Sequence, residues 1–283
     1  MPIITELNLY PIKSCAGLSL NEATLTEAGL ATQLVYDREW MVIDADGVAL
    51  TQRTHPKMAL IQPRIKGDHL EIRAPGMLAL EVPLDLPAPD TTPRLNVNVW
   101  GNEILAFDLG ELCATWFSKF LDAPLRFVRF HADAIRFANT KWTGEIQAPT
   151  LFADGYPLLI ISQASLDDLN RKMLAAGREA LPMDRFRANI VISGCEAHEE
   201  DYAEELVSGD IRIKPVKPCA RCNLPAVSQS SGKVGPNPLD ILMTYRIDER
   251  IDGGISFGMN SIVLAGSGQT LRVGQELELN LAF

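Results

Sequence analysis

Turn sequences recur at short intervals through residues 1–106, and this spacing restricts the possible fold more than any other feature. The turns are Ala16-Gly17, Ala28-Gly29, Asp44-Ala45-Asp46-Gly47, Lys66-Gly67-Asp68 and Pro75-Gly76. Short apolar runs such as Trp40–Ile43 lie between them. Short strands separated by turns are typical of an all-β barrel or sandwich. We therefore predict a mainly β fold, of the β-rich α+β class, with a few helices.

Three segments have helical rather than strand periodicity. The spacing predicts helices over Leu109–Leu121, where Asp108 can serve as the cap, over Ser162–Ala176, and over the short Pro238–Leu242. Strands are predicted again over 189–193, 210–216, 256–264 and 277–281. A chain of 283 residues is long enough for two domains of ordinary size. We predict two β-rich domains, residues 1–120 and 121–283.

Charge and hydropathy exclude several classes of protein. The chain carries 26 Lys and Arg against 36 Asp and Glu, a net charge of −10, which is a poor electrostatic match for nucleic acid or an anionic membrane. No apolar run approaches the roughly 20 residues that span a bilayer, and the first residues lack a secretory signal pattern. Five cysteines are too few, and odd in number, for a disulfide framework. We expect free thiols and a cytoplasmic protein.

The strongest local pattern is the pair Cys219 and Cys222, separated by Ala220 and Arg221. Such a pair can bind zinc, exchange a disulfide, or present one thiolate from a loop to a metal. Arg221 would favour a thiolate by lowering the pKa of a neighbouring thiol. An isolated pair of this kind is more often two small apolar fillers.

Three basic turns form the second group of candidates. Lys13 and Ser14 follow the first predicted strand, Arg38 precedes the strand at Trp40, and Arg185 and Arg187 precede the strand at 189–193. Lysine, hydroxyl and turn amides together suit a phosphate group, and arginines suit an anionic ligand. Each turn taken alone is more typical of an ordinary polar turn or a solvated charged loop. The common nucleotide-binding, zinc-protease and serine-hydrolase motifs are absent from the sequence, and the four histidines have no ligand spacing.

Taken together and in order, these motifs resemble the MOSC family. The similarity is to the branch that fuses an N-terminal MOSC β-barrel domain to a MOSC domain, which includes the mitochondrial amidoxime-reducing component and its bacterial relatives. The matching segments are residues 10–15, 37–43, 99–101, 165–170, 186–195, 219–222 and 257–258. The resemblance implies an N-terminal β-barrel-like domain packed on a β-barrel MOSC domain, with the ligand site in the cleft between them.

The resemblance also implies a molybdenum cofactor, in which a phosphate-bearing pterin holds molybdenum. By the family pattern, Cys222 is the metal ligand and the catalytic residue, and thiolates are soft ligands suited to such a metal. The positions that match contacts to the pterin and its phosphate are Lys13, Ser14, Arg38, Gly155, Tyr156, Arg187, Ala220 and Asn260. The family is further associated with pyridoxal phosphate binding. Pro225 departs from the family pattern close to the metal cysteine, which affects the substrate expected there.

The implied reaction is the two-electron reduction of a small N-hydroxylated compound to the N–H compound and water. The chain has no ferredoxin cysteine set and no dinucleotide fingerprint, so we expect electrons from a separate donor, a flavin reductase with an iron–sulfur or haem carrier. Arg212, Lys214 and Lys217 are a candidate docking patch, and a solvated strand edge is an equally good interpretation of them. Two alternatives remain: a sulfur carrier that uses a Cys222 persulfide, and a cofactor-binding protein without turnover.

Overall fold

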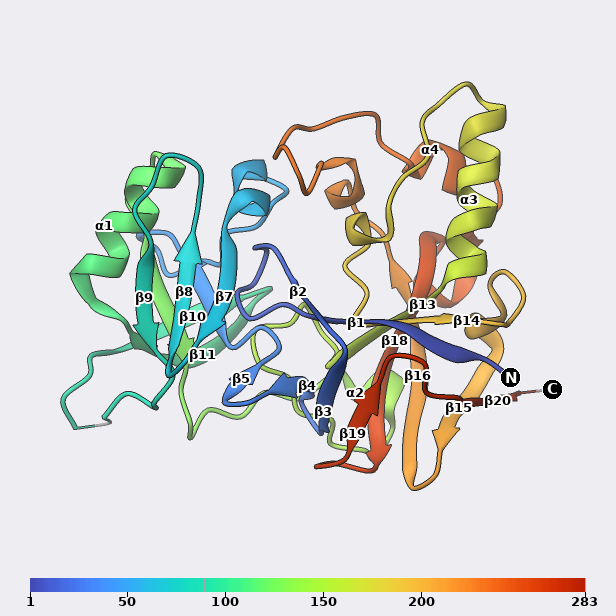
Figure 1. Cartoon of the computed structure of the whole chain (residues 1–283), viewed down its shortest axis with the longest axis horizontal. Helices are drawn as coiled ribbons and strands as arrows, with labels where there is room; N and C mark the ends of the chain where they lie inside the picture. Colours follow the sequence, from blue (N-terminus) through green and yellow to red (C-terminus); the bar gives the residue numbers. More distant parts are fainter. Residues whose placement is uncertain (89, 283) are drawn as a thin grey trace.

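The largest of the four β-sheets among the described residues has nine strands. Most of its strands lie in the right-hand part of the molecule in Figure 1. The computed structural model describes residues 1–88 and 90–282, so Phe283, the last residue of the second predicted domain, lies outside the described residues. The strands follow the order β2 (Leu18–Leu20), β1 (Ile3–Leu9), β14 (Ile190–Ser193), β13 (Leu158–Ser162), β18 (Gly254–Ala265), β16 (Ile211–Ala220), β15 (Ala203–Ser208) and β20 (Glu278–Leu281), and β17 (Ile247–Asp248) pairs with β18. β13 and β14 are parallel, and the other pairs of this sheet are antiparallel.

Three smaller antiparallel sheets complete the β structure of the described residues. The first contains β10 (Arg94–Val99), β11 (Asn102–Asp108), β12 (Arg126–Phe130) and β6 (Trp40–Ile43); the second contains β19 (Thr270–Arg272), β3 (Glu22–Thr26), β4 (Gly29–Thr32) and β5 (Val35–Tyr36); and the third contains β7 (Gln62–Lys66), β8 (His69–Arg73) and β9 (Leu80–Pro83). The mainly β fold with few helices is therefore confirmed.

The helices are α1 (Gly110–Leu121), α2 (Thr140–Thr143), α3 (Gln163–Ala175) and α4 (Leu239–Leu242). α1, α3 and α4 lie within a residue of the predicted ranges. Ser162 caps α3, since its Oγ accepts from Ser165 N at 3.0 Å. The N-cap of α1 is Leu109, without a side-chain cap, so the predicted cap Asp108 lies one residue earlier, where its Oδ1 accepts from Gly110 N at 3.1 Å. No helix within the described part of the chain is long and apolar enough to cross a membrane.

The prediction for the strand at 210–216 was too short. β16 continues through Pro215 and Pro218 to Ala220, although proline cannot donate to a sheet ladder. The register against β18 shifts between Pro215 and Lys217 and again between Pro218 and Ala220. These irregularities accommodate the prolines inside a central strand. Cys219 therefore lies at the end of a strand and not in a loop.

The two predicted domains exchange strands. β1, at the start of the chain, pairs with β14, and β19, near its end, pairs with β3. β12 follows the predicted boundary at residue 120 but joins the sheet of β6 and β11. The boundary itself stays a prediction. Because β1 runs beside β14, the turn that follows β1 is brought against the second half of the chain.

Candidate functional site

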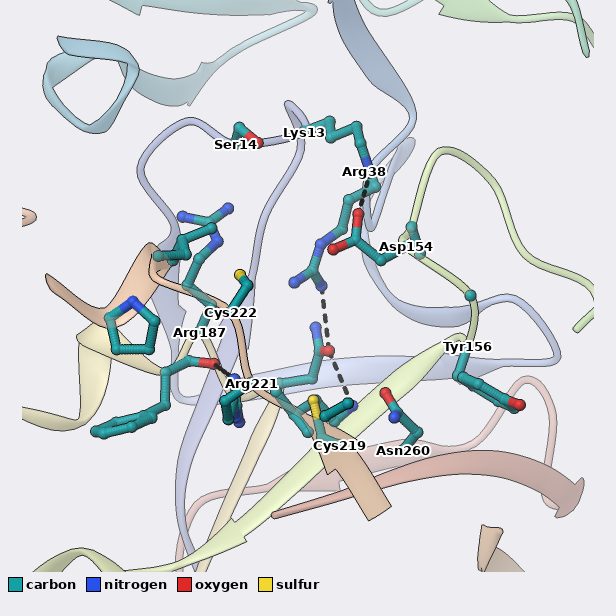
Figure 2. A pocket seen from close by; sticks show the side chains of 18 of the residues that line it. Lys13, Ser14, Arg38, Asp154, Tyr156, Arg187, Cys219, Arg221, Cys222 and Asn260 are labelled. Carbon is teal, nitrogen blue, oxygen red and sulfur yellow. Dashed lines mark hydrogen bonds and ion pairs between the residues drawn. The ribbon is translucent and has the colours of Figure 1, made fainter. Parts of the chain in front are cut away.

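A single pocket collects the residues that the sequence singled out, although they come from distant segments (Figure 2). Its lining includes Lys13, Ser14, Arg38, Gly155, Tyr156, Arg187, Ala220, Cys222 and Asn260. The contributing segments are the turn after β1, the turn before β6, the residues before β13, the residues before β14, and the end of β16 with the middle of β18. The structure thus brings together the residues that the family pattern predicted, and their roles remain predictions. Arg185, the other arginine of its turn, does not line the pocket and donates to Pro225 O at 3.1 Å.

Three of these residues hold an unusual backbone conformation. Ser14, Arg38 and Arg187 have φ values of 63°, 52° and 57°, in the left-handed region that non-glycine residues rarely occupy. Arg38 N donates to Tyr10 O at 2.7 Å, and Trp40 N donates to Pro11 O at 3.0 Å, so the first two basic turns brace each other. Strained backbone of this kind persists only where its surroundings impose it, and it concentrates at functional sites.

Both arginines lie against the ring of a buried tyrosine, Tyr10. The guanidinium carbons of Arg38 and Arg187 lie 4.4 and 4.2 Å from the ring centroid of Tyr10. Burial raises the pKa of Tyr10 to about 12, even though both arginines act to lower it. The ring therefore remains a neutral phenol, and its π system offsets part of the repulsion between the two cations.

Arg187 and Arg221 in the pocket wall each have a buried guanidinium nitrogen without an acceptor among the described residues. Arg187 Nη1 donates to Cys15 O at 2.7 Å, but its Nη2 has no partner. Arg221 donates from Nε to Phe257 O at 2.8 Å and from Nη1 to Phe186 O at 3.0 Å, and its Nη2 also has no partner. Buried donors are nearly always paired, and an unpaired one is destabilising. Both arginines line the pocket, so an anionic ligand there would supply the missing acceptors.

Sequence reasoning missed Arg53, Asp154 and Asn189, which also line the pocket. Lys13 is buried, and its Nζ donates to Phe152 O at 2.8 Å and to the Asp154 carboxylate, with which it forms an ion pair. Burial lowers the pKa of Lys13, and Asp154 opposes that shift.

Asn189 links the turn that contains Arg38 to the large sheet. Its Oδ1 accepts from Leu159 N and from Arg38, both at 3.1 Å, and its Nδ2 donates to Asp37 at 3.0 Å. Asn189 falls inside a matching segment, 186–195, but nothing local marks its side chain as part of the site.

Both cysteines of the pair line the pocket, and both are half-buried. Burial raises the pKa of Cys219, against the effect of Arg221, so Cys219 favours the neutral thiol. Cys219 lies at the end of β16, and Cys222 lies beyond it. Within residues 1–88 and 90–282, no group of three or more His, Cys, Asp or Glu side chains could hold a metal by itself.

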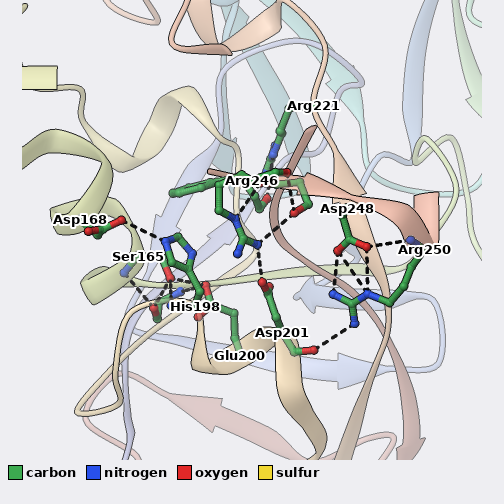
Figure 3. Close-up of polar contacts among 12 residues, drawn as sticks. Ser165, Asp168, His198, Glu200, Asp201, Arg221, Arg246, Asp248 and Arg250 are labelled. Atoms are coloured by element: carbon green, nitrogen blue, oxygen red, sulfur yellow. Dashed lines mark hydrogen bonds and ion pairs between the residues drawn. The ribbon is translucent and has the colours of Figure 1, made fainter. Parts of the chain in front are cut away.

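A polar network behind the pocket fixes the backbone that holds Arg221 (Figure 3). Ser256, next to Phe257, donates from its amide to Arg246 O at 2.9 Å, and its hydroxyl accepts from Arg246 Nη2 at 3.0 Å. Arg246 also pairs with Asp201, which is buried. His198 packs edge-on against Phe257. These contacts keep the Phe257 carbonyl in place as the acceptor for Arg221.

Comparison with known proteins agrees with the resemblance. Residues 1–124 match the MOSC N-terminal beta barrel domain, and residues 147–278 match the MOSC domain. The chain is 36% identical to human mitochondrial amidoxime reducing component 2 over 248 residues, covering 86% of this chain and 72% of that protein. It is 34% identical to mouse mitochondrial amidoxime-reducing component 1 over 284 residues, covering 98% and 82%.

A third relative has a different name. Bovine molybdenum cofactor sulfurase is 31% identical over 274 residues, which cover 91% of this chain but only 30% of the sulfurase. The names of the relatives link them to amidoxime reduction and to the molybdenum cofactor. Both domain matches and the near full-length relatives show that the chain belongs to the MOSC family, in the branch that joins an N-terminal MOSC β-barrel domain to a MOSC domain.

Proposed function

We propose that this protein is a molybdenum-cofactor-dependent oxidoreductase that reduces N-hydroxylated compounds. The observation that carries the proposal is the pocket itself. It combines the half-buried thiols of Cys219 and Cys222 with buried guanidinium nitrogens, on Arg187 and Arg221, that lack acceptors. A phosphate-bearing pterin that carries a thiolate-seeking metal fits this donor set.

Each lining residue then has a definite part. Cys222 would ligate molybdenum, and Lys13, Ser14, Arg38 and Arg187 would bind the phosphate and the pterin with charge-assisted hydrogen bonds. The remaining predicted contacts are Gly155, Tyr156, Ala220 and Asn260. When bound, the cofactor supplies the two-electron chemistry, and the protein supplies position and charge. Pyridoxal phosphate would compete for the same cationic groups and stays a prediction of the resemblance.

The overall reaction consumes two electrons and two protons for each N–OH group and releases the N–H compound and water. Dinucleotide, haem and plant-type iron–sulfur motifs are absent from the sequence, so the electrons come from a partner, a flavin reductase with an iron–sulfur or haem carrier. The reaction takes place in the cytoplasm in this proposal.

The residues around the proposed docking patch, Arg212, Lys214 and Lys217, change how much positive charge it can offer. Arg212 is neutralised by Glu205 at 2.8 Å, whereas Lys217 lies 5.9 Å from the ring centroid of Tyr156, a pocket residue. Lys217 and Lys214 therefore make the better candidate for contact with an acidic carrier, and the encounter would bury a small area, as is typical of redox partners.

The sulfurase relative supports a second candidate, a sulfur carrier with a persulfide on Cys222. The test is to produce the protein in a host that makes the molybdenum cofactor. We expect molybdenum and pterin to copurify, and the protein to reoxidise a reduced viologen dye when an amidoxime is added. Persulfide on Cys222 without molybdenum would instead support the carrier. Bound pterin without dye oxidation would support a protein that only binds the cofactor.

A further inference from the structure

A half-exposed tryptophan, Trp100, lies beside the pocket. Its backbone conformation is unfavourable for a tryptophan. Trp100 and Gly101 form the two-residue turn between β10 and β11, where Val99 pairs with Asn102. Their φ values are 53° and 85°. Two-residue turns with both φ values positive favour Asn, Asp or Gly at the first position. Tryptophan is unfavourable there, because its Cβ crowds the backbone at positive φ.

The indole is nevertheless held in a defined place. Its Nε1 donates to Asp154 at 3.0 Å, and the guanidinium carbon of Arg53 lies 4.5 Å from the ring centroid. A hydrogen bond within the turn, from Gly101 N to the Asn98 side chain at 2.9 Å, supports its conformation. The residue still exposes 49% of its surface. A large ring that is anchored at one edge and open to solvent is pre-organised for stacking.

The position of this ring connects it to the pocket. Arg53 and Asp154 both line the pocket, whereas Trp100, which contacts both, does not. Trp100 and Arg53 therefore border the mouth. Arg53 Nε is buried without a partner, so the guanidinium retains a donor for a ligand oxygen. Asp154 joins this border to the buried Lys13 inside the pocket.

We propose that Trp100 and Arg53 form an aromatic rim that determines substrate preference, by stacking the ring of a planar, uncharged aromatic N-hydroxyl compound at the mouth of the pocket. This inference rests on the proposed function, since it names the class of substrate for the same site. Stacking on an aromatic side chain does not depend on the detailed pattern of hydrogen-bonding groups, so the rim selects flat rings over aliphatic chains and accepts many ring types. Binding, and not stability, accounts for the unfavourable turn residue.

The test compares benzamidoxime with acetamidoxime, which carry the same reacting group with and without a ring. Binding of each compound to the protein is measured by calorimetry for wild type, Trp100→Asn and Trp100→Phe. Asparagine suits the turn, so Trp100→Asn removes the ring while its thermal midpoint stays equal to or above that of wild type. We expect benzamidoxime to bind Trp100→Asn about tenfold more weakly, acetamidoxime to be unaffected, and Trp100→Phe to keep most of the affinity for benzamidoxime.

Three results would contradict the proposed role of the aromatic rim. They are unchanged benzamidoxime binding by Trp100→Asn, an equal loss for both compounds, and a lower thermal midpoint that marks the indole as structural. Dye-driven turnover separates this inference from the proposed function. If wild-type protein loaded with cofactor reduced neither compound, the proposed function would fail, while the binding comparison would still decide the rim.

Discussion

At the scale of single residues, several energetically unfavourable conformations and unpaired groups occur together in the pocket. Arg187 combines a left-handed backbone, nearly complete burial and an unpaired Nη2. Burial lowers the pKa of Arg187, because the charged form has lost its hydration. A binding partner that restores an acceptor would relieve this cost. Such groups are therefore better explained by a ligand than by the stability of the fold.

Arg187→Lys tests that explanation. Lysine keeps the charge but loses the planar fork, so it cannot bond Cys15 O and a ligand oxygen in the same geometry. We expect cofactor affinity to fall about tenfold, as for the loss of one charge-assisted hydrogen bond, with little change in the thermal midpoint. The control is Arg212→Lys, an exposed arginine paired with Glu205. Pterin fluorescence of the purified variants measures occupancy, and full occupancy of Arg187→Lys would remove Arg187 from the site.

At the scale of elements, the site depends on close contact between strands of the large sheet. Gly258 of β18 has φ +77°, and a Cβ at this position would lie 2.8 Å from Ile160 O and 2.5 Å from Ile161 Cγ1 of β13. The adjacent Phe257 carbonyl accepts from Arg221. Only glycine allows β13 and β18 to approach this closely while the carbonyl keeps its direction.

Gly258→Ala should therefore lower the free energy of unfolding by more than the positive φ at this position alone would. Gly253→Ala is the matched control, with φ +74° and open space around its Cβ position. We expect a loss of about 1 kcal/mol for Gly253→Ala and a further loss of about 2 kcal/mol for Gly258→Ala. Urea denaturation of both variants measures the two free energies of unfolding. Equal losses would show that β13 moves away from the added Cβ with no loss of stability.

The helix α3 contributes a pH-dependent contact close to the polar network. Asp168 pairs with Lys172 one turn along the helix and with His198 at 3.2 Å. Burial alone would raise the pKa of Asp168, but these partners outweigh it and hold the pKa below its usual range. A carboxyl with a lowered pKa stabilises the fold above its unfolded value of about 3.9, and this stability is lost as the pH falls through the folded pKa.

Asp168→Asn should accordingly lower the free energy of unfolding by about 1 kcal/mol at pH 7. The difference from wild type should shrink as the pH falls below about 4, where the wild-type carboxyl takes up its proton. Denaturation curves at pH 7, 5 and 3 measure this change. A difference that stays constant across the three would mean that the charge of Asp168 does not stabilise the fold.

At the scale of the whole molecule, the site belongs to neither half of the chain alone. Lys13 and Arg38 come from the first half, and Arg187 and Cys222 come from the second. The pairing of β1 with β14 fixes the two sets relative to each other. The chain is also acidic as a whole, with a net charge of −10, so an acidic electron carrier needs a local basic surface in order to dock.

Charge reversal tests the docking surface. The double variant Lys214→Glu, Lys217→Glu should slow turnover several-fold when electrons come from a reductase and carrier, because steering by charge is lost. Turnover driven by a small reduced dye should be unchanged. The slowing should weaken in high salt, which screens exposed charges. Equal losses with both electron sources would place the carrier elsewhere.

Local signals account for what the sequence predicted correctly. Helices α1 and α3 were found because periodicity and caps lie within a few residues of each other, and the basic turns were found because each contains its own charged residue and turn. Arg53 and Asp154 were missed because their roles depend on long-range contacts. Asp154 lies 141 residues from Lys13 and 54 residues from Trp100. The end of β16 was missed because strand bulges allow prolines that strand preference excludes.

The central claim is that Cys222, and not Cys219, binds molybdenum in the pocket. Its most direct test is the molybdenum content, measured by mass spectrometry, of wild type, Cys222→Ala and Cys219→Ala produced in the same cofactor-competent host. We predict stoichiometric molybdenum in wild type, most of it in Cys219→Ala, and little in Cys222→Ala, with thermal midpoints showing that all three are folded. Molybdenum retained in full by Cys222→Ala, or lost equally from both variants, would contradict the claim.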